Sequence, residues 1–213
     1  MVVIFRNISC LREKIKFIYT VLMKEMYQKT VSKPVTFVGV GLHTGLNSKI
    51  TILPGKENEG VIFKRIDLKK NNLINANYKN VSSAKLCTTL QNECGVKVST
   101  VEHLLAAFYI SEIDNAIVEI NCEEVPIMDG SAKEFLEILK ETKLKTQAAK
   151  KKILKVIEKV ELIDGKRRIS IEPNKEDFEV DFQLNYENKF IGNQRNIINF
   201  QLDNLNEISE SRT

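Results

Sequence analysis

Glu102 and His103 are the neighbouring residues of this sequence whose types best suit hydrolytic chemistry. A carboxylate can accept a proton as a general base, and an imidazole can ligate a metal ion. The site that they suggest is incomplete, because a catalytic zinc ion normally has three protein ligands and one open position for water. The chain contains only 2 histidines, so the remaining ligands cannot all be histidines of this sequence.

An amphipathic helix is expected to carry this pair. Ser99 and Glu102 have the spacing of a capping box, which predicts that the helix begins at Ser99. An apolar stripe follows at i, i+3, i+4 and i+7, formed by Val101, Leu104, Leu105 and Phe108. His103 lies off this stripe, and the small residues Ala106 and Ala107 would leave room beside it for a metal ion and a substrate. On spacing alone, the simpler interpretation is favoured, in which Glu102 only caps the helix and His103 is an ordinary half-buried histidine.

Four short segments, taken together, shift the balance towards catalysis. In chain order they are Val38–Gly45 (VGVGLHTG), Leu86–Thr88 (LCT), Ser99–Leu104 (STVEHL) and Val125–Ala132 (VPIMDGSA). Each segment alone is modest evidence, but the ordered set over residues 38–132 is specific. With these segments the chain resembles the UDP-3-O-acyl-N-acetylglucosamine deacetylases, the zinc-dependent amidases of lipid A synthesis. The resemblance runs from about Thr30 to Thr213.

The resemblance implies hydrolysis of the acetamide of a UDP-3-O-acyl-N-acetylglucosamine substrate by a water molecule that Zn²⁺ activates. It assigns His103 as a zinc ligand and Glu102 as the general base. Ser211-Arg212-Thr213 matches the start of a family segment whose threonine helps to polarise the substrate carbonyl, so Thr213 is expected to be catalytic.

Three further residues are expected to lie near the site or to contact the substrate. Cys87 matches a family cysteine near the metal, although a buried thiol without a catalytic role is the simpler interpretation. His43 lies in a glycine-rich turn and is expected to be structural or to face the substrate. Asp129 is expected near the site by resemblance, although Asp129-Gly130 is also typical of a turn that leads to a helix cap at Ser131.

The other family ligands match no residue of this sequence. The family's second zinc-binding histidine, its zinc-binding aspartate and its general-acid histidine would all follow Thr213. We therefore expect a C-terminally truncated family member, and we expect residues 1–213 alone to be inactive.

A weak internal repeat predicts two domains. Ile52–Phe63 and Ile171–Phe182 share Ile, Pro, Lys, Glu, Val and Phe at a constant offset of 119 residues. The domains would cover residues 30–145 and 146–213, after an N-terminal extension over residues 1–29 that is disordered or begins at a mis-assigned start. Because His103 shifted by the same offset falls beyond Thr213, the second domain would lack its helical half.

The expected fold class is α+β, with two repeated two-layer domains of sheet and helices, the second of them incomplete. Helices beginning at Ser99 and Ser131 need one sheet face to cover. The lysine-rich residues 140–155 are expected to form a solvated connection between the repeats. The predicted strands cover residues 35–40, 49–53, 61–65, 85–90, 96–98 and 115–121.

Charge, cysteine spacing and hydropathy indicate which partners and which cellular compartment suit this chain. A net charge of +4 without a nucleic-acid motif argues against a nucleic-acid partner. The 4 cysteines contain no C-x-x-C pair and suit a reducing, cytoplasmic compartment. The apolar run 17–23 is too short to span a bilayer, although a membrane-surface helix is an alternative for this region. The competing hypothesis for the whole chain is a non-catalytic fragment or binding module that retains the first domain's fold; the oligomeric state stays open.

Overall fold

The computed structural model describes residues 26–174, 178–200 and 205–212 of the chain. They form two compact units, the first within Glu25–Lys151 and Asn206–Thr213, the second within Lys152–Leu205. Thr213 and the N-terminal residues 1–25 lie outside the described residues, and so do the predictions made for them. Within the described ranges, no helix is long and apolar enough to cross a membrane.

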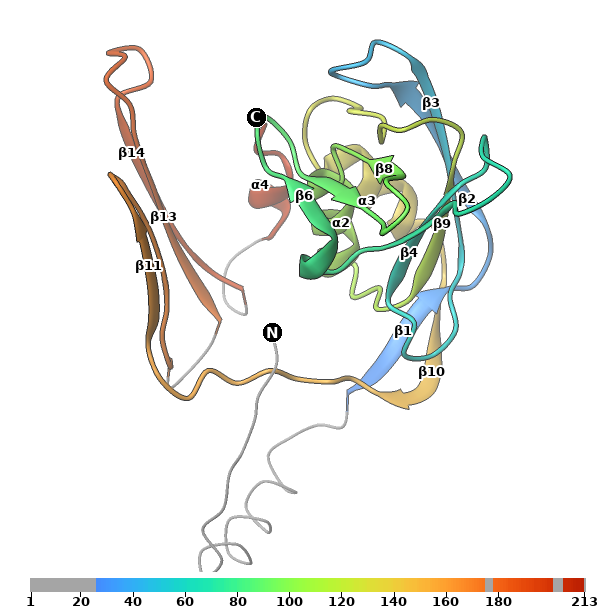
Figure 1. The fold of residues 1–213 in the computed structure, drawn as a ribbon. Coiled ribbons are helices and arrows are strands. Elements are labelled where there is room, and N and C mark those ends of the chain that lie inside the picture. Colours follow the sequence, from blue (N-terminus) through green and yellow to red (C-terminus); the bar gives the residue numbers. More distant parts are fainter. Residues whose placement is uncertain (1–25, 175–177, 201–204, 213) are drawn as a thin grey trace, which may run out of the picture. The chain divides into compact units, whose positions relative to one another are not determined.

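A five-stranded sheet forms one layer of the first unit (Figure 1). β9 is its central strand and pairs antiparallel with β3 and parallel with β4, whereas the outer pairs are antiparallel. Alternate residues of β9 are fully buried, as the apolar alternation over 115–121 predicts. The strands lie in the order β2 (Val35–Val40), β3 (Asn47–Pro54), β9 (Ala116–Ile120), β4 (Val61–Arg65) and β5 (Leu73–Asn75).

Two helices, α2 (Glu102–Ile110) and α3 (Lys133–Lys140), lie side by side against one face of this sheet (Figure 1). The rings of Phe37 in β2 and Phe135 in α3 have centroids 5.1 Å apart and join the two layers. The predicted α+β class, with helices covering one sheet face, is confirmed for this unit.

The first unit also contains a separate two-stranded sheet, which contradicts one prediction. β1 (Tyr27–Val31) pairs antiparallel with β10 (Leu144–Lys150). The solvated connection predicted over residues 140–155 is therefore wrong for residues 144–150. Their polar sequence, LKTQAAK, has no strand signal of its own, and the strand forms because its backbone pairs with β1.

A small three-stranded sheet precedes α2 in the chain. It contains β6 (Val81–Ser83), β7 (Thr89–Gln91) and β8 (Lys97–Val98), and follows the short 3₁₀ helix η1 (Tyr78–Asn80). The turn predicted at residues 92–95 joins β7 to β8. The strand predicted over 85–90 is wrong for residues 85–88, which form a loop, because Leu86 has a φ of 69° and leaves the extended conformation.

The described residues of the second unit contain two hairpins. β11 (Val160–Asp164) pairs with β12 (Arg167–Ile171), and β13 (Glu179–Asn185) pairs with β14 (Asn193–Asn199). Two pairs of residues matched by the repeat hold similar places in their strands. Ile171 is the last residue of β12, and Ile52 lies near the end of β3. Phe182 lies in β13, and Phe63 lies in β4. The two hairpins thus follow the chain order of β2–β3 and β4–β5. No counterpart of β9 joins them among the described residues, so superposition of the two repeats stays a prediction.

Candidate active site

Glu102 and His103 occupy the first turn of α2 and are both half-buried. The helix is anchored by Leu104, Ala107 and Phe108, which are buried in the core. Ala107 therefore packs inside rather than leaving room beside His103, whereas Ala106 is exposed. The predicted carboxylate and imidazole are thus presented together at one end of a firmly packed helix.

The predicted capping box is wrong. Val101 is the N-cap residue and makes no side-chain cap, and the Ser99 hydroxyl donates instead to the carbonyl of Glu123 at 3.2 Å. The Glu102 carboxylate has a different partner, because its Oε2 accepts the backbone N–H of Thr88 at 3.1 Å. Glu102 therefore holds a neighbouring loop and leaves the helix terminus uncapped.

That loop carries Cys87, which the sequence also places near the site. Cys87 is half-buried, and its Sγ lies 3.8 Å from the hydroxyl of Thr89. Beside it, Leu86 is 84% exposed and has a left-handed backbone. The Thr88–Glu102 hydrogen bond thus brings the second and third of the four sequence segments together.

The glycine-rich segment forms a tight turn after β2. Gly45 donates to the carbonyl of Gly41 at 3.0 Å, and Gly45 has a φ of 66°, a conformation that glycine adopts without strain. His43 is exposed at this turn. The backbone N–H groups of His43 and Thr44 donate to the carboxylate of Glu124, at 2.9 and 2.8 Å respectively. The first segment is therefore attached to the strand-to-helix connection that also contains the fourth.

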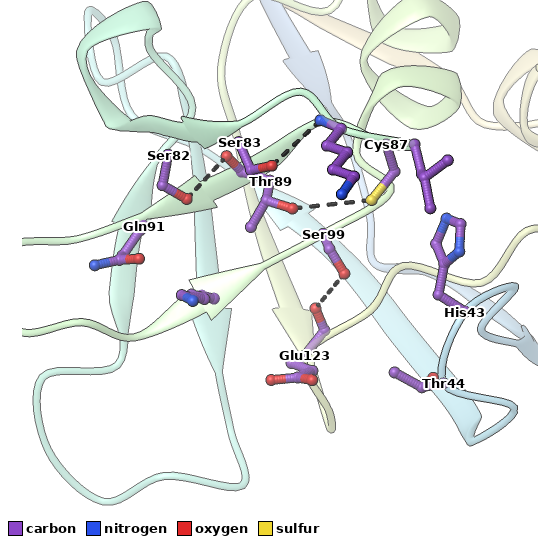
Figure 2. Close-up of a pocket in the computed structure, with 12 residues that line it drawn as sticks. His43, Thr44, Ser82, Ser83, Cys87, Thr89, Gln91, Ser99 and Glu123 are labelled. Atoms are coloured by element: carbon purple, nitrogen blue, oxygen red, sulfur yellow. Dashed lines mark hydrogen bonds between the residues drawn. The ribbon is translucent and has the colours of Figure 1, made fainter.

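An open cavity of about 400 Å³ lies between this turn and the three-stranded sheet (Figure 2). His43 and Cys87, which are both expected near the site, line this cavity, and their proximity to a substrate stays a prediction. Glu102, His103 and Asp129 are not among its lining residues. The full lining is His43, Thr44, Ser82, Ser83, Lys85, Leu86, Cys87, Thr89, Gln91, Lys97, Ser99 and Glu123.

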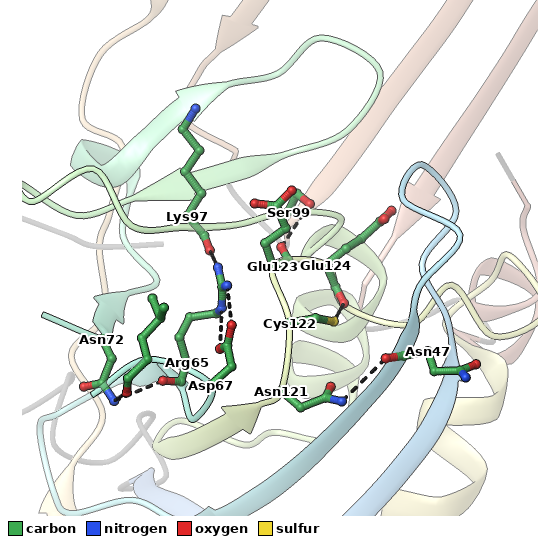
Figure 3. Close-up of polar contacts among 11 residues, drawn as sticks. Asn47, Arg65, Asp67, Asn72, Lys97, Ser99, Asn121, Cys122, Glu123 and Glu124 are labelled. Atoms are coloured by element: carbon green, nitrogen blue, oxygen red, sulfur yellow. Dashed lines mark hydrogen bonds and ion pairs between the residues drawn. The ribbon is translucent and has the colours of Figure 1, made fainter. Parts of the chain in front are cut away.

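Arg65 connects the small sheet of this cavity to the main sheet. Its Nη1 donates to the carbonyl of Lys97 in β8 at 2.8 Å, and its Nε and Nη2 pair with both carboxylate oxygens of Asp67 at 2.9 and 2.7 Å (Figure 3). A planar guanidinium with several donors can make all these bonds at once. Arg65 thus links the cavity wall to the end of β4.

Both carboxylate oxygens of Asp129 accept hydrogen bonds from other side chains of the protein. Its Oδ1 accepts the hydroxyl of Ser131 at 2.7 Å, and its Oδ2 accepts Nη2 of Arg212 at 2.9 Å. The Ser131 hydroxyl, and after it Arg212, hold the pKa of Asp129 below its ordinary value. Ser131 in turn accepts the N–H of Lys133 at 3.1 Å, which confirms the predicted turn and places the polar cap one residue before the N-cap Ala132. Arg212, which follows α4 (Leu205–Ser209), is thereby fixed beside α3.

The chemistry of the described side chains suits zinc only in part. An imidazole such as that of His103 is a normal zinc ligand, and so is a thiolate. Within residues 26–174, 178–200 and 205–212, however, no three His, Cys, Asp or Glu residues are grouped closely enough to hold a metal ion. His103 is thus a candidate ligand whose partners are not beside it in the described structure.

Comparisons with known proteins agree with the resemblance. A model of the UDP-3-O-acyl N-acetylglycosamine deacetylase family matches residues 28–213. The chain belongs to this family. It is 39% identical over 189 residues to the UDP-3-O-acyl-N-acetylglucosamine deacetylase of Nautilia profundicola, covering 88% of this chain and 63% of that protein. It is 39% identical over 191 residues to the enzyme of that name from Shewanella frigidimarina, with coverages of 88% and 62%. The chain thus spans less than two thirds of the length of these relatives.

Family membership confirms the main prediction made from the four segments. Sequence reasoning missed Glu124 and Thr100, which join those segments in the structure. Thr100 donates its hydroxyl to Oε1 of Glu124 at 2.9 Å. Glu123 and Glu124 are adjacent and identical in type, so no local pattern indicates that Glu124 is the buried one.

Proposed function

We propose that this chain forms part of a zinc-dependent deacetylase that hydrolyses the acetamide of UDP-3-O-acyl-N-acetylglucosamine in lipid A biosynthesis. The observation that supports it best is the pairing of Glu102 and His103 on one helical turn, with the Cys87 loop bonded to Glu102, in a chain of this family. A cytoplasmic location belongs to the same proposal, and the described cysteines Cys87, Cys94 and Cys122 are free thiols, as in a reducing compartment.

In this proposal His103 provides one zinc ligand, and the zinc, when bound, would supply an acidified water molecule and polarise the amide carbonyl. Glu102 takes the proton from the attacking water. Its Oε2 already accepts the Thr88 N–H, and Oε1 accepts no hydrogen bond from the described residues, so Oε1 is the oxygen that receives the proton. Thr213 would donate its hydroxyl to the developing oxyanion.

A second candidate, a binding module without catalysis, is favoured by one observation. The described residues contain no group of three ligands, so residues 1–213 alone are expected to hold no zinc in a catalytic geometry and to release no acetate. Dialysed protein can be assayed for bound zinc and for acetate release. One equivalent of zinc together with steady turnover would contradict this expectation.

A hybrid protein tests the deacetylase proposal itself. Residues 28–213 of this chain would replace the corresponding part of the Nautilia profundicola relative, which supplies the remainder of its own sequence. We expect the hybrid to bind zinc and to release acetate, and His103→Ala to abolish both. A folded hybrid that binds zinc without any turnover would favour the binding module.

A further inference from the structure

Glu124 is a fully buried glutamate that the proposed mechanism does not use. Its Oε1 accepts the N–H of His43 and the hydroxyl of Thr100, both at 2.9 Å. Its Oε2 accepts the N–H of Thr44 at 2.8 Å and, at 3.2 Å, a second share of the His43 N–H. A buried carboxylate is costly unless it is well hydrogen-bonded, and both oxygens of Glu124 have donors.

One set of these donors belongs to the glycine-rich turn. A Cβ on Gly41 would lie 2.4 Å from Oε2 of Glu124 and 2.4 Å from the hydroxyl of Thr44. Only a glycine at this position lets the carboxylate reach the N–H groups of the turn. The close approach of Glu124 therefore accounts for Gly41, and it fixes the backbone that carries His43 at the cavity.

The other donor belongs to the residue that leads into α2. Thr100 is 2% exposed and has a φ of 56°, a left-handed conformation that strains a β-branched residue. Strain of this kind persists only where surrounding contacts hold it. The bond from the Thr100 hydroxyl to Glu124 is such a contact, two residues before Glu102.

We propose that Glu124 is a positioning residue, which holds the His43 turn and the strained start of α2 in one fixed arrangement. Its catalytic meaning rests on the proposed deacetylase function, because the arrangement sets His43 at the cavity relative to Glu102 and His103. The bonds also keep Glu124 ionised. Burial alone would raise its pKa, but the donors of His43, Thr44 and Thr100 outweigh burial and lower it.

Glu124→Gln tests this role without creating a cavity. The glutamine has one oxygen and one NH₂ group in place of two oxygens. Whichever way the amide lies, its NH₂ faces either the N–H of His43 or the N–H of Thr44, so one of these backbone donors loses its closest acceptor. Glu141→Gln is the matched control, because Glu141 is exposed at the end of α3 and the same charge is removed.

The histidine NMR spectrum of residues 1–213 is the direct readout. His43 and His103 are the only histidines of the chain, so each imidazole gives one assignable signal. In Glu124→Gln we expect both signals to move and hydrogen exchange at the His43 or Thr44 amide to rise about tenfold or more. Glu141→Gln should change neither. A folded Glu124→Gln protein with both signals and both amides unchanged would overturn the proposal.

Thr100→Val gives a second test that does not depend on the stability of the first variant. It removes the hydroxyl and keeps the β-branched shape, so only the bond to the start of α2 is lost. We expect the His103 signal to move and the His43 signal to stay. An unmoved His103 signal would refute the coupling to α2.

The hybrid protein separates this inference from the proposed function. There Glu124→Gln should lower kcat about tenfold, as expected for misplaced groups, with KM little changed. An unchanged kcat would contradict a catalytic consequence of the positioning. If the unsubstituted hybrid released no acetate, the deacetylase proposal would fail, while the histidine spectrum would still decide the role of Glu124.

Discussion

Replacing Glu102 separates two roles that one carboxylate holds in this structure. It anchors the Cys87 loop through the Thr88 N–H, and we propose that it accepts the proton of the attacking water. Glu102→Gln keeps an oxygen that can accept the Thr88 N–H but cannot act as a base at neutral pH. Glu102→Ala removes both functions.

The two variants should therefore differ in the stability of the Cys87 loop but show a similar loss of kcat. A hydrogen bond to a charged acceptor is worth about 1.5–3 kcal/mol and a neutral one about 0.5–1.5 kcal/mol. The Thr88 amide should exchange roughly fivefold faster in Glu102→Gln and on the order of 10- to 100-fold faster in Glu102→Ala. Both variants should lose a factor on the order of 10² or more in kcat, the usual loss on removing a positioned base.

Steady-state kinetics and amide exchange on the hybrid protein would measure the two effects side by side, with zinc content determined for each variant. We expect zinc to be retained in Glu102→Gln, because His103 is unchanged. If Glu102→Gln kept near-normal kcat while Glu102→Ala lost it, the loop anchor would be the whole role of Glu102. The proposed base would then be wrong.

Three further predictions concern the scaffold. Gly55→Ala should destabilise the first unit by about 2 kcal/mol or more, measured by exchange of its slowest amides, because the new Cβ would lie 2.6 Å from the backbone N of Ala116. The natural protein should be more stable than Glu124→Gln, and this difference in stability should be fully present above pH 4.5 and shrink as the pH falls through the lowered pKa of Glu124. Exchange of the slowest amides, measured over a series of pH values, would test this. Arg212→Lys should loosen residues 209–212, because a lysine cannot reproduce the paired bonds from Nε and Nη2 of Arg212 to Asp129. The amides of these residues should then exchange faster. The exposed ion pair between Arg212 and Asp129 should itself add under about 1 kcal/mol to stability.

The main elements of the first unit could be predicted because their apolar residues recur with the period of the structure they form. The alternation in β9 and the stripe of α2 both point to buried faces that the structure contains. β10 could not be predicted in this way, since its residues are polar and its pairing with β1 joins segments more than a hundred residues apart. Long-range backbone pairing leaves no local pattern.

The helix starts show a different limit of sequence reasoning. Ser99 and Glu102 have the spacing of a capping box, yet both side chains are drawn to other segments, Ser99 to the Glu123 carbonyl and Glu102 to Thr88. A competing partner brought close by the fold outweighs a local cap that is worth about 1 kcal/mol. The segments found by resemblance indicate parts of the chain that the fold brings together, because they sample positions that meet only after folding.

The different surroundings of Glu102 and Glu124 support the different tasks that we propose for these two glutamates. Both oxygens of Glu124 are engaged by donors of the protein, and the residue has no exposed surface, so it has no lone pair to offer a substrate or a water molecule. Glu102 is half-buried and has one oxygen engaged, which fixes the orientation of the carboxylate, while its other oxygen has no donor among the described residues. A general base needs both a defined orientation and an accessible lone pair. Of these two carboxylates, only Glu102 has an oxygen without a donor among the described residues, so we assign the role of base to Glu102. The Thr88 N–H determines which of its oxygens would take the proton.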